Sequence, residues 1–161
     1  MAKTKEVKTN AMRLLDSAGI SYQVHTYDAE DGEIDAVSVA RKCGQDIEQV
    51  FKTLVTKGSD GNYYVFVVPG KERLDLKKAA GAVAVKSVEM IPQKELLPLT
   101  GYVHGGCSPV GMKKPFRTVI DETAVLFDSI MVSGGKVGVQ VEVNPADLLA
   151  VTEAETAEIT L

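Results

Sequence analysis

Strand, turn and strand patterns follow one another in the stretch Val50-Phe51-Lys52-Thr53-Leu54-Val55-Thr56-Lys57, Gly58-Ser59-Asp60-Gly61, Asn62-Tyr63-Tyr64-Val65-Phe66-Val67-Val68. Its first and last runs are rich in β-branched and aromatic residues, and the middle run is typical of a turn. The stretch therefore predicts an antiparallel hairpin. Because strand side chains alternate, Lys52 lies beside Leu54 on one partly apolar face, while Phe51 and Val55 lie on the other.

Lys52 has two interpretations in this position. It is either an edge-strand lysine that reaches solvent and discourages aggregation, or an ammonium held in a pocket. In a pocket it could donate a hydrogen bond to a carbonyl or phosphate oxygen and stabilise developing negative charge. The pattern alone leaves both open.

Over the whole chain, with the two hairpin strands included, strand patterns outnumber helical ones. Further strands are expected over 20–27, 83–85, 118–121, 129–132 and 137–143. Two helices are expected from Val7 to Ala18 and from Ile91-Pro92 to Pro98. Others are expected to begin at the caps Asp35, Asp46, Asp75 and Asn144-Pro145, with Gln49 completing a capping box at Asp46. The helices cluster early and late, which favours an α+β fold with a mixed, curved sheet.

Composition limits the class of protein. The chain has 161 residues with 45% hydrophobic content, so we expect one domain over 1–161. No apolar run approaches the roughly 18 residues that span a bilayer, and no apolar stretch follows Met1-Ala2-Lys3-Thr4-Lys5, so we expect a cytoplasmic protein without a membrane partner. Cys43 and Cys107 should be reduced thiols, and the isolated His25 and His104 predict neither a metal site nor another cofactor.

The charge is unevenly distributed along the chain. The net charge is −4, yet the segment 71–136 carries 10 basic and 7 acidic side chains, whereas 137–161 carries 5 acidic and 0 basic ones. A locally basic segment in an acidic protein permits a weak contact with RNA, although ordinary surface charge explains the pattern as well.

A glycine-rich segment, Gly101-Tyr102-Val103-His104-Gly105-Gly106-Cys107-Ser108-Pro109-Val110-Gly111, lies inside this basic part and is followed by Met112-Lys113-Lys114. Such a loop can present backbone N–H groups to a carbonyl or phosphate oxygen, and it can also be a plain turn between strands. Lys52 and the run Ser133-Gly134-Gly135-Lys136 share one feature with this segment, since they too place polar groups in a strand or turn. Together they suggest one pocket.

The chain resembles the YbaK-type aminoacyl-tRNA deacylases, free-standing relatives of the editing domain inserted in bacterial prolyl-tRNA synthetase. The resemblance covers nearly the whole chain and rests on these blocks, in order: His25-Thr26-Tyr27-Asp28, Phe51-Lys52-Thr53-Leu54, Leu74-Asp75-Leu76-Lys77-Lys78-Ala79, Val88-Glu89-Met90, Thr100-Gly101-Tyr102 with Gly105-Gly106 and Ser108-Pro109, and Val132-Ser133-Gly134-Gly135-Lys136. It is strongest to the branch that clears cysteine mischarged on proline tRNA.

The resemblance implies a fold, an activity and site residues. The fold would be a mixed sheet closing toward a barrel with surrounding helices. The activity would be hydrolysis of the ester that joins an amino acid to the tRNA 3′-terminal ribose, with the tRNA acceptor end and prolyl-tRNA synthetase as candidate partners. Lys52 would be the catalytic lysine, and the substrate-binding residues would be Tyr27, Gly105, Gly106, Pro109, Ser133 and Gly134.

The sequence departs from the family at two positions. Cys107 stands where an aliphatic residue is more common, which makes it a poor candidate for a nucleophile. The segment from Gly32 to Ala36 lacks the aromatic residue associated with the loop over the pocket and has Ile34 instead.

Other functions remain open from the residues themselves. A cysteine hydrolase would use Cys107 with His104, but neighbours in sequence do not define thiolate geometry, and no third orienting group is evident. A non-catalytic module that binds tRNA or a synthetase is another alternative, although Lys52 argues against it. Within the editing hypothesis, alanine or proline could be the amino acid removed, and either water or the substrate thiol could attack the ester.

Overall fold

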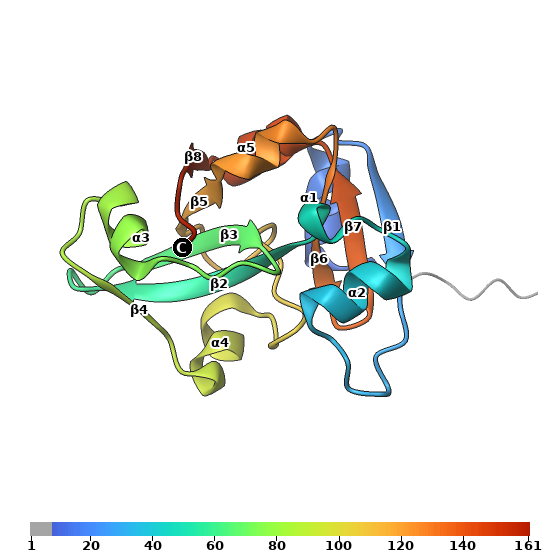
Figure 1. Cartoon of the computed structure of the whole chain (residues 1–161), viewed down its shortest axis with the longest axis horizontal. Coiled ribbons are helices and arrows are strands. Elements are labelled where there is room, and N and C mark those ends of the chain that lie inside the picture. Colours follow the sequence, from blue (N-terminus) through green and yellow to red (C-terminus); the bar gives the residue numbers. More distant parts are fainter. Residues whose placement is uncertain (1–7) are drawn as a thin grey trace, which may run out of the picture.

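Residues 8–161 are described by a computed structural model, in which two β-sheets are flanked by helices (Figure 1). The larger sheet has the strand order β4-β2-β3-β5-β8, with bounds Val88–Met90, Phe51–Gly58, Tyr63–Pro69, Arg117–Asp121 and Glu155–Ala157. The predicted hairpin is formed by β2 and β3, in a register that pairs Lys52 with Val68. β4 joins β2 antiparallel, whereas β3, β5 and β8 run parallel to one another. The prediction of an α+β fold with a mixed sheet is confirmed.

The smaller sheet is antiparallel and has the order β1-β7-β6, with bounds Tyr22–Thr26, Val139–Val143 and Ile130–Lys136. A parallel bridge between Val50 and Met131 links it to the start of β2. Among residues 8–161 the strands do not close into a barrel, because they divide into these two sheets.

The helices begin where side chains satisfy free backbone N–H groups. The side chains of Thr9, Asp35, Asp75 and Asn144 cap α1 (Asn10–Ser17), α2 (Ala36–Cys43), α3 (Leu76–Ala82) and α5 (Pro145–Thr152). The caps expected at Asp35, Asp75 and Asn144 are therefore confirmed. The remaining elements are α4 (Gln93–Thr100) and two 3₁₀ turns, η1 (Ile47–Gln49) and η2 (Glu122–Leu126).

The core occupies both faces of the larger sheet. On one face, Val67 and Ile120 pack with Val141 of the smaller sheet and with α1 and α5. On the other face, Phe66 packs with α3 and with Ile159, which is fully buried. The acidic end of the chain is thus part of the sheet and core, whereas its sequence indicated only a closing tail.

The strand expected over 83–85 is wrong. Ala84 has a positive φ of 57°, and its N–H donates to the Gly81 carbonyl, so the chain turns at the end of α3. The extended segment begins at Val88 instead.

One expected helix end and one expected capping box are also wrong. Pro98 lies inside α4, which continues to Thr100 and ends at Gly101, where the backbone is left-handed. Asp46 does cap the next element, since its carboxylate accepts from the Glu48 N–H, but that element is a single 3₁₀ turn. The Gln49 side chain donates to the Ser129 carbonyl instead of closing a capping box.

Some expectations fall on the first seven residues. Val7 and the segment from Met1 to Lys5 lie outside the described residues. Within residues 8–161, no helix is both long and apolar enough to cross a membrane.

Candidate active site

A pocket of about 450 Å³ lies where the start of β2 meets the smaller sheet. Its walls come from the loop before α2, the first residues of α2 and β2, one residue of α4, the glycine-rich segment and the β6–β7 pair. Three of the predicted site residues line it together: Lys52, Gly105 and Ser133. These residues are far apart in sequence, so the tertiary fold brings them together.

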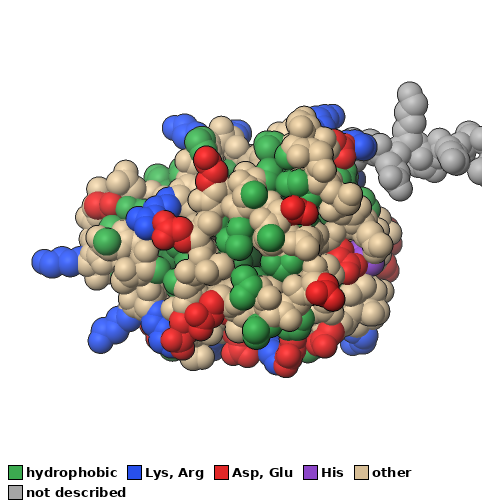
Figure 2. All heavy atoms as spheres, turned by 90° about the horizontal axis from the view of Figure 1, so that it is seen from above, with side chains coloured by type: hydrophobic (Ala, Val, Ile, Leu, Met, Phe, Trp, Pro, Cys, Tyr) green, Lys and Arg blue, Asp and Glu red, His purple; other side chains and the backbone are tan. Residues whose placement is uncertain are grey.

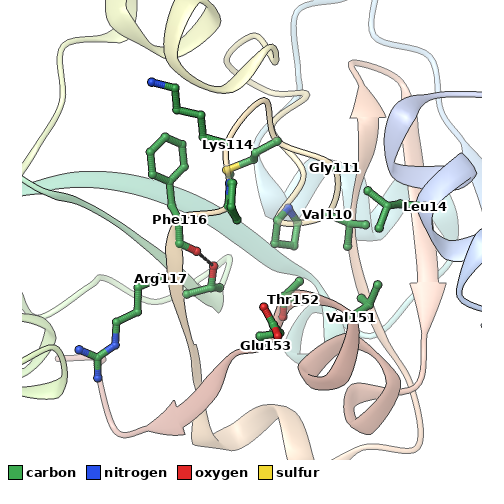
Figure 3. A pocket seen from close by; sticks show the side chains of 13 residues that line it. Leu14, Val110, Gly111, Lys114, Phe116, Arg117, Val151, Thr152 and Glu153 are labelled. Carbon is green, nitrogen blue, oxygen red and sulfur yellow. Dashed lines mark hydrogen bonds between the residues drawn. The ribbon is translucent and has the colours of Figure 1, made fainter.

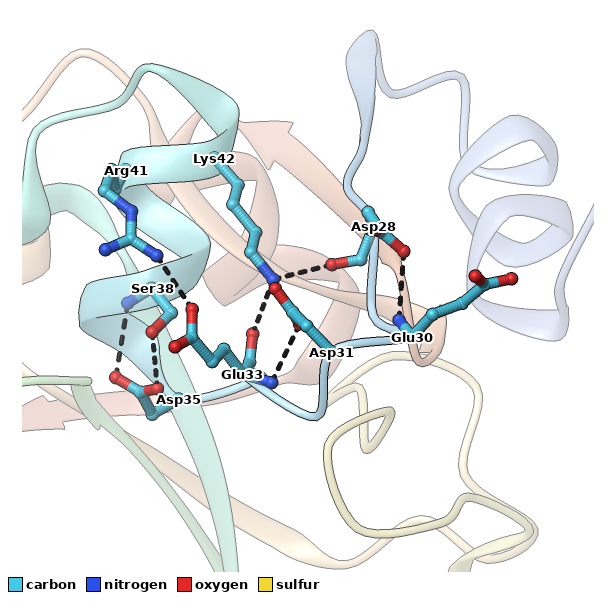
Figure 4. Close-up of polar contacts among 8 residues, drawn as sticks. All are labelled: Asp28, Glu30, Asp31, Glu33, Asp35, Ser38, Arg41 and Lys42. Atoms are coloured by element: carbon cyan, nitrogen blue, oxygen red, sulfur yellow. Dashed lines mark hydrogen bonds and ion pairs between the residues drawn. The ribbon is translucent and has the colours of Figure 1, made fainter.

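The loop from Asp28 to Asp35 forms one wall and is held in place by α2 (Figure 4). The Lys42 ammonium donates to the Asp28 carbonyl, at 2.7 Å, and to the Asp31 carboxylate, at 2.8 Å. The hydrogen bond from Lys42 lowers the pKa of Asp31. Asp35 accepts from the Ser38 hydroxyl at 2.7 Å and begins the helix. Side chains of α2 thus hold this acidic loop.

Lys52 enters the pocket from β2, where it is half-buried. Within residues 8–161 its ammonium has no hydrogen bond or ion pair. Burial lowers the pKa of Lys52, the nearby Arg73 charge lowers it further, and Glu72 opposes both. An ammonium without a protein partner is available to an oxygen atom of a ligand.

The glycine-rich segment contributes Gly105, whose φ of +84° favours glycine. A Cβ at this position would lie 2.7 Å from the Ile34 Cδ1 atom, so Ile34 packs directly over the segment. No described residue accepts a hydrogen bond from the Gly105 N–H. The Gly106 N–H, by contrast, donates to the Val103 carbonyl at 2.9 Å. Of these two amides, only that of Gly105 is free to bind a ligand.

The other predicted binding residues lie outside the pocket wall. Gly106 is buried against the backbone of Lys136 and Val137. The carbonyl of Gly134 accepts from Thr9 at 2.5 Å. The Tyr27 ring lies 6.0 Å from the Lys42 ammonium, and its buried hydroxyl has no hydrogen-bond partner among the described residues.

Pro109 lines a second pocket, of about 350 Å³, between the segment 109–118, α1 and the end of α5 (Figure 3). Viewed from the side of α5, hydrophobic side chains gather around a hollow in the middle of the face (Figure 2). Leu14 and Val151 face this second pocket, which contains none of the other predicted site residues.

Cys107 and His104 both line the first pocket, but the described residues contain no hydrogen bond between them. Burial raises the pKa of Cys107 to about 12. A thiol that stays protonated is a weak nucleophile. The structure therefore disfavours the cysteine hydrolase.

Sequence reasoning missed Gln140 and Thr53 as pocket residues. Gln140 is 6% exposed, and neither its Oε1 atom nor the Thr53 Oγ1 atom has a hydrogen-bond partner among residues 8–161. The one sequence signal for Gln140 was its position as the single amide side chain in the strand pattern 137–143. An amide in such a pattern ordinarily indicates the solvent-exposed face of a strand. In the described part of the chain, no three His, Cys, Asp or Glu residues are grouped so as to hold a metal ion.

Comparison with known proteins identifies the family. The aminoacyl-tRNA editing domain matches residues 33–151. The chain belongs to this family. This editing-domain protein is 44% identical to an Enterococcus faecalis protein with the provisional name Cys-tRNA(Pro)/Cys-tRNA(Cys) deacylase EbsC, over 99% of the chain and 98% of that relative.

Two further similarities are to proteins whose names refer to prolyl-tRNA synthetase. A crystal structure described provisionally as a trans-editing enzyme for prolyl-tRNA synthetase matches with a TM-score of 0.84 at 30% identity, covering 97% of this chain and 99% of the other. A proline–tRNA ligase of Thermosipho melanesiensis is 30% identical over 98 residues, which are 61% of this chain and 17% of the ligase.

Proposed function

We propose that this protein hydrolyses the ester bond of mischarged aminoacyl-tRNA, with Cys-tRNA(Pro) as the preferred substrate. The observation that carries the proposal is that Lys52, whose ammonium is unpaired, and Gly105, whose N–H is free, line the same pocket. The volume of about 450 Å³ accommodates an aminoacyl group but not a tRNA, so only the acceptor end would enter.

Lys52 and Gly105 would act on the ester by binding oxygen. Their donors can hold the carbonyl oxygen and stabilise the negative charge that develops there during attack, or can hold the neighbouring phosphate. Ser133, whose Oγ accepts from the Gly135 N–H at 3.2 Å, keeps its hydroxyl hydrogen for the substrate. No protein nucleophile is required.

Two attacking groups fit this site. Water attack gives free cysteine and tRNA. In the alternative, the cysteine sulfur forms a bond to its own carbonyl carbon, the ester C–O bond breaks, and the thiol proton goes to the ribose oxygen. That route gives a cyclic thiolactone and fails with Ala-tRNA(Pro), which has no thiol, so the products and this substrate separate the two routes.

The tRNA acceptor end is the proposed partner, and a prolyl-tRNA synthetase would deliver it. The similarity to the proline–tRNA ligase supports this link. Adding a prolyl-tRNA synthetase should increase the rate at limiting tRNA without changing the products.

The test is single-turnover deacylation of Cys-tRNA(Pro), Cys-tRNA(Cys), Ala-tRNA(Pro) and Pro-tRNA(Pro). We expect Cys-tRNA(Pro) to react fastest and Lys52→Ala to lose about 100-fold or more of that rate. Lys52→Arg should recover little, because a wider, forked guanidinium does not reproduce a compact ammonium. Lys57→Ala is the matched control, since Lys57 lies on the same strand but is exposed and outside the pocket. A fully active, folded Lys52→Ala protein would refute the proposed role.

A further inference from the structure

Gln140 is a buried amide that no other described residue satisfies. It lies on β7, paired across the sheet with Ser133 of β6 on one side and His25 of β1 on the other. The His25 Nε2 atom is hydrogen-bonded to the Glu142 Oε1 atom at 2.8 Å, and the Ser133 Oγ accepts from the Gly135 N–H. Within residues 8–161, neither end of the Gln140 carboxamide makes a hydrogen bond. A 180° rotation of the carboxamide therefore exchanges the positions of its oxygen and nitrogen atoms without breaking any hydrogen bond.

Thr53 presents the same situation on β2. Thr53 lines the same pocket. Its Oγ1 atom is buried and has no partner among the described residues. Buried polar groups are almost always hydrogen-bonded, so two unsatisfied oxygens in one pocket need explanation. Both can accept a hydrogen bond, and the group that would satisfy them together must donate at least two.

The charged residues around the pocket indicate which kind of ligand group could donate these hydrogen bonds. One acidic and one basic residue, Asp35 and Lys52, both line it. A cationic donor is attracted by Asp35 and repelled by Lys52, while an ester or phosphate oxygen is attracted by Lys52. An aminoacyl ester carries both kinds of group, because its α-ammonium has three N–H donors and its carbonyl is an acceptor.

We propose that Gln140 and Thr53 bind the free α-ammonium of the aminoacyl group, so that N-acylated aminoacyl-tRNA is rejected. The inference rests on the proposed deacylase function and adds a specificity that the function does not require. An acyl group on the nitrogen removes its charge and two of its N–H donors and adds bulk. The pocket would thus distinguish a mischarged aminoacyl-tRNA from a peptidyl-tRNA, whose ester is the same.

The test compares Cys-tRNA(Pro) with N-acetyl-Cys-tRNA(Pro) in single-turnover assays. The wild-type protein should deacylate the free-amine substrate at least about 10-fold faster, the ratio expected from losing one hydrogen bond to a charged group. Gln140→Leu should slow the free-amine substrate about 10-fold and leave the acetylated one nearly unchanged. Gln140→Glu keeps the acceptor and should retain the preference. The control is Gln23→Leu, on the exposed edge strand of the same sheet, which should behave as wild type.

Binding of unreactive analogues gives a second readout. The probes are 3′-deoxy-3′-amino-adenosine carrying cysteine in amide linkage and the same compound with 3-mercaptopropionate, which lacks the α-amine. Wild type should bind the first about 10-fold more tightly, and Gln140→Leu should remove the difference. Equal rates on both tRNA substrates, or equal affinity for both analogues, would overturn the inference. If the wild-type protein deacylated neither tRNA substrate, that result would instead refute the proposed function.

Discussion

At the scale of single residues, the protonation state of Lys52 should couple activity to stability. Burial lowers its pKa below 10.5 in the folded protein. At pH values between the lowered pKa of the folded state and 10.5, Lys52 is protonated more often in the unfolded chain than in the folded protein. The contribution of Lys52 to the free energy of unfolding therefore rises with pH in this window. The ammonium disappears over the same window, so enzymatic deacylation should fall.

The measurement is deacylation, corrected for spontaneous ester hydrolysis, together with urea unfolding from about pH 7 to about pH 10.5. Wild type should lose rate while this contribution to stability rises, and Lys52→Met should show neither pH-dependent change. A wild-type rate that stays constant over the whole range would contradict the role of the ammonium.

Gly105 should tolerate no side chain, for two separable reasons. Gly105→Ala places a Cβ at positive φ, which should lower the free energy of unfolding by about 1–2 kcal/mol. It also pushes the Ile34 side chain, and Ile34 lines the pocket, so activity should fall. Adding Ile34→Ala should restore part of the activity but not the stability.

Gly61 provides the matched control for this substitution. Its φ is +86°, it lies in the hairpin turn, and no atom lies within 4 Å of the position that a Cβ would occupy. Gly61→Ala should lower stability by a similar amount with full activity, as measured by thermal melting and deacylation. If Gly105→Ala were fully active, the segment would be only a turn.

At the scale of elements, the pocket depends on how closely α2 approaches the larger sheet. A Cβ on Gly70, at the end of β3, would lie 2.1 Å from the Ala36 Cβ and 3.2 Å from the Val50 carbonyl oxygen. Gly70→Ala should therefore displace α2 and lower the free energy of unfolding by about 1–3 kcal/mol, with a loss of deacylation because Ala36 lines the pocket.

Gly81→Ala is the opposite case, since this glycine lies in α3 with nothing near its Cβ position. It should raise the free energy of unfolding by about 0.5–1 kcal/mol and leave activity unchanged. Urea unfolding of both variants checks the pair. A neutral Gly70→Ala would mean that α2 is free to move.

At the scale of the whole molecule, the net charge of −4 should make tRNA binding weak and dependent on salt. If the basic segment neutralises about three phosphates, a rise from about 50 to about 200 mM salt should weaken binding roughly 20-fold. Lys113→Gln with Lys114→Gln, beside the glycine-rich segment, should reduce both the affinity and the salt dependence.

The control has the same net charge change. Lys77→Gln with Lys86→Gln alters α3 and the loop after it, at the end of the molecule away from α2 (Figure 1), and should have little effect. Filter binding of uncharged tRNA over a salt series measures both pairs. Tight binding that salt does not weaken would contradict this account.

Much of the local structure, and the family, could be predicted from the amino-acid sequence. The hairpin was predictable because β-branched and aromatic runs flank a turn, and three helix starts were predictable because Asp35, Asp75 and Asn144 can bind backbone N–H groups next to them in the chain. Errors such as the strand over 83–85 arose where neighbouring hydrogen bonds outweighed an apolar pattern.

Which polar groups share the pocket depends on the tertiary fold and could not be predicted from the sequence. Lys52, Gly105 and Ser133 meet there. Gly106 instead packs against the backbone of the β6–β7 turn and Gly134 against the Val139 side chain, although the sequence presents these glycines alike. Alternation places a side chain on a face of its own strand, but burial depends on what covers that face. Gln140 is therefore buried against the pocket rather than exposed, because α2, the start of β2 and the glycine-rich segment enclose its side of the sheet.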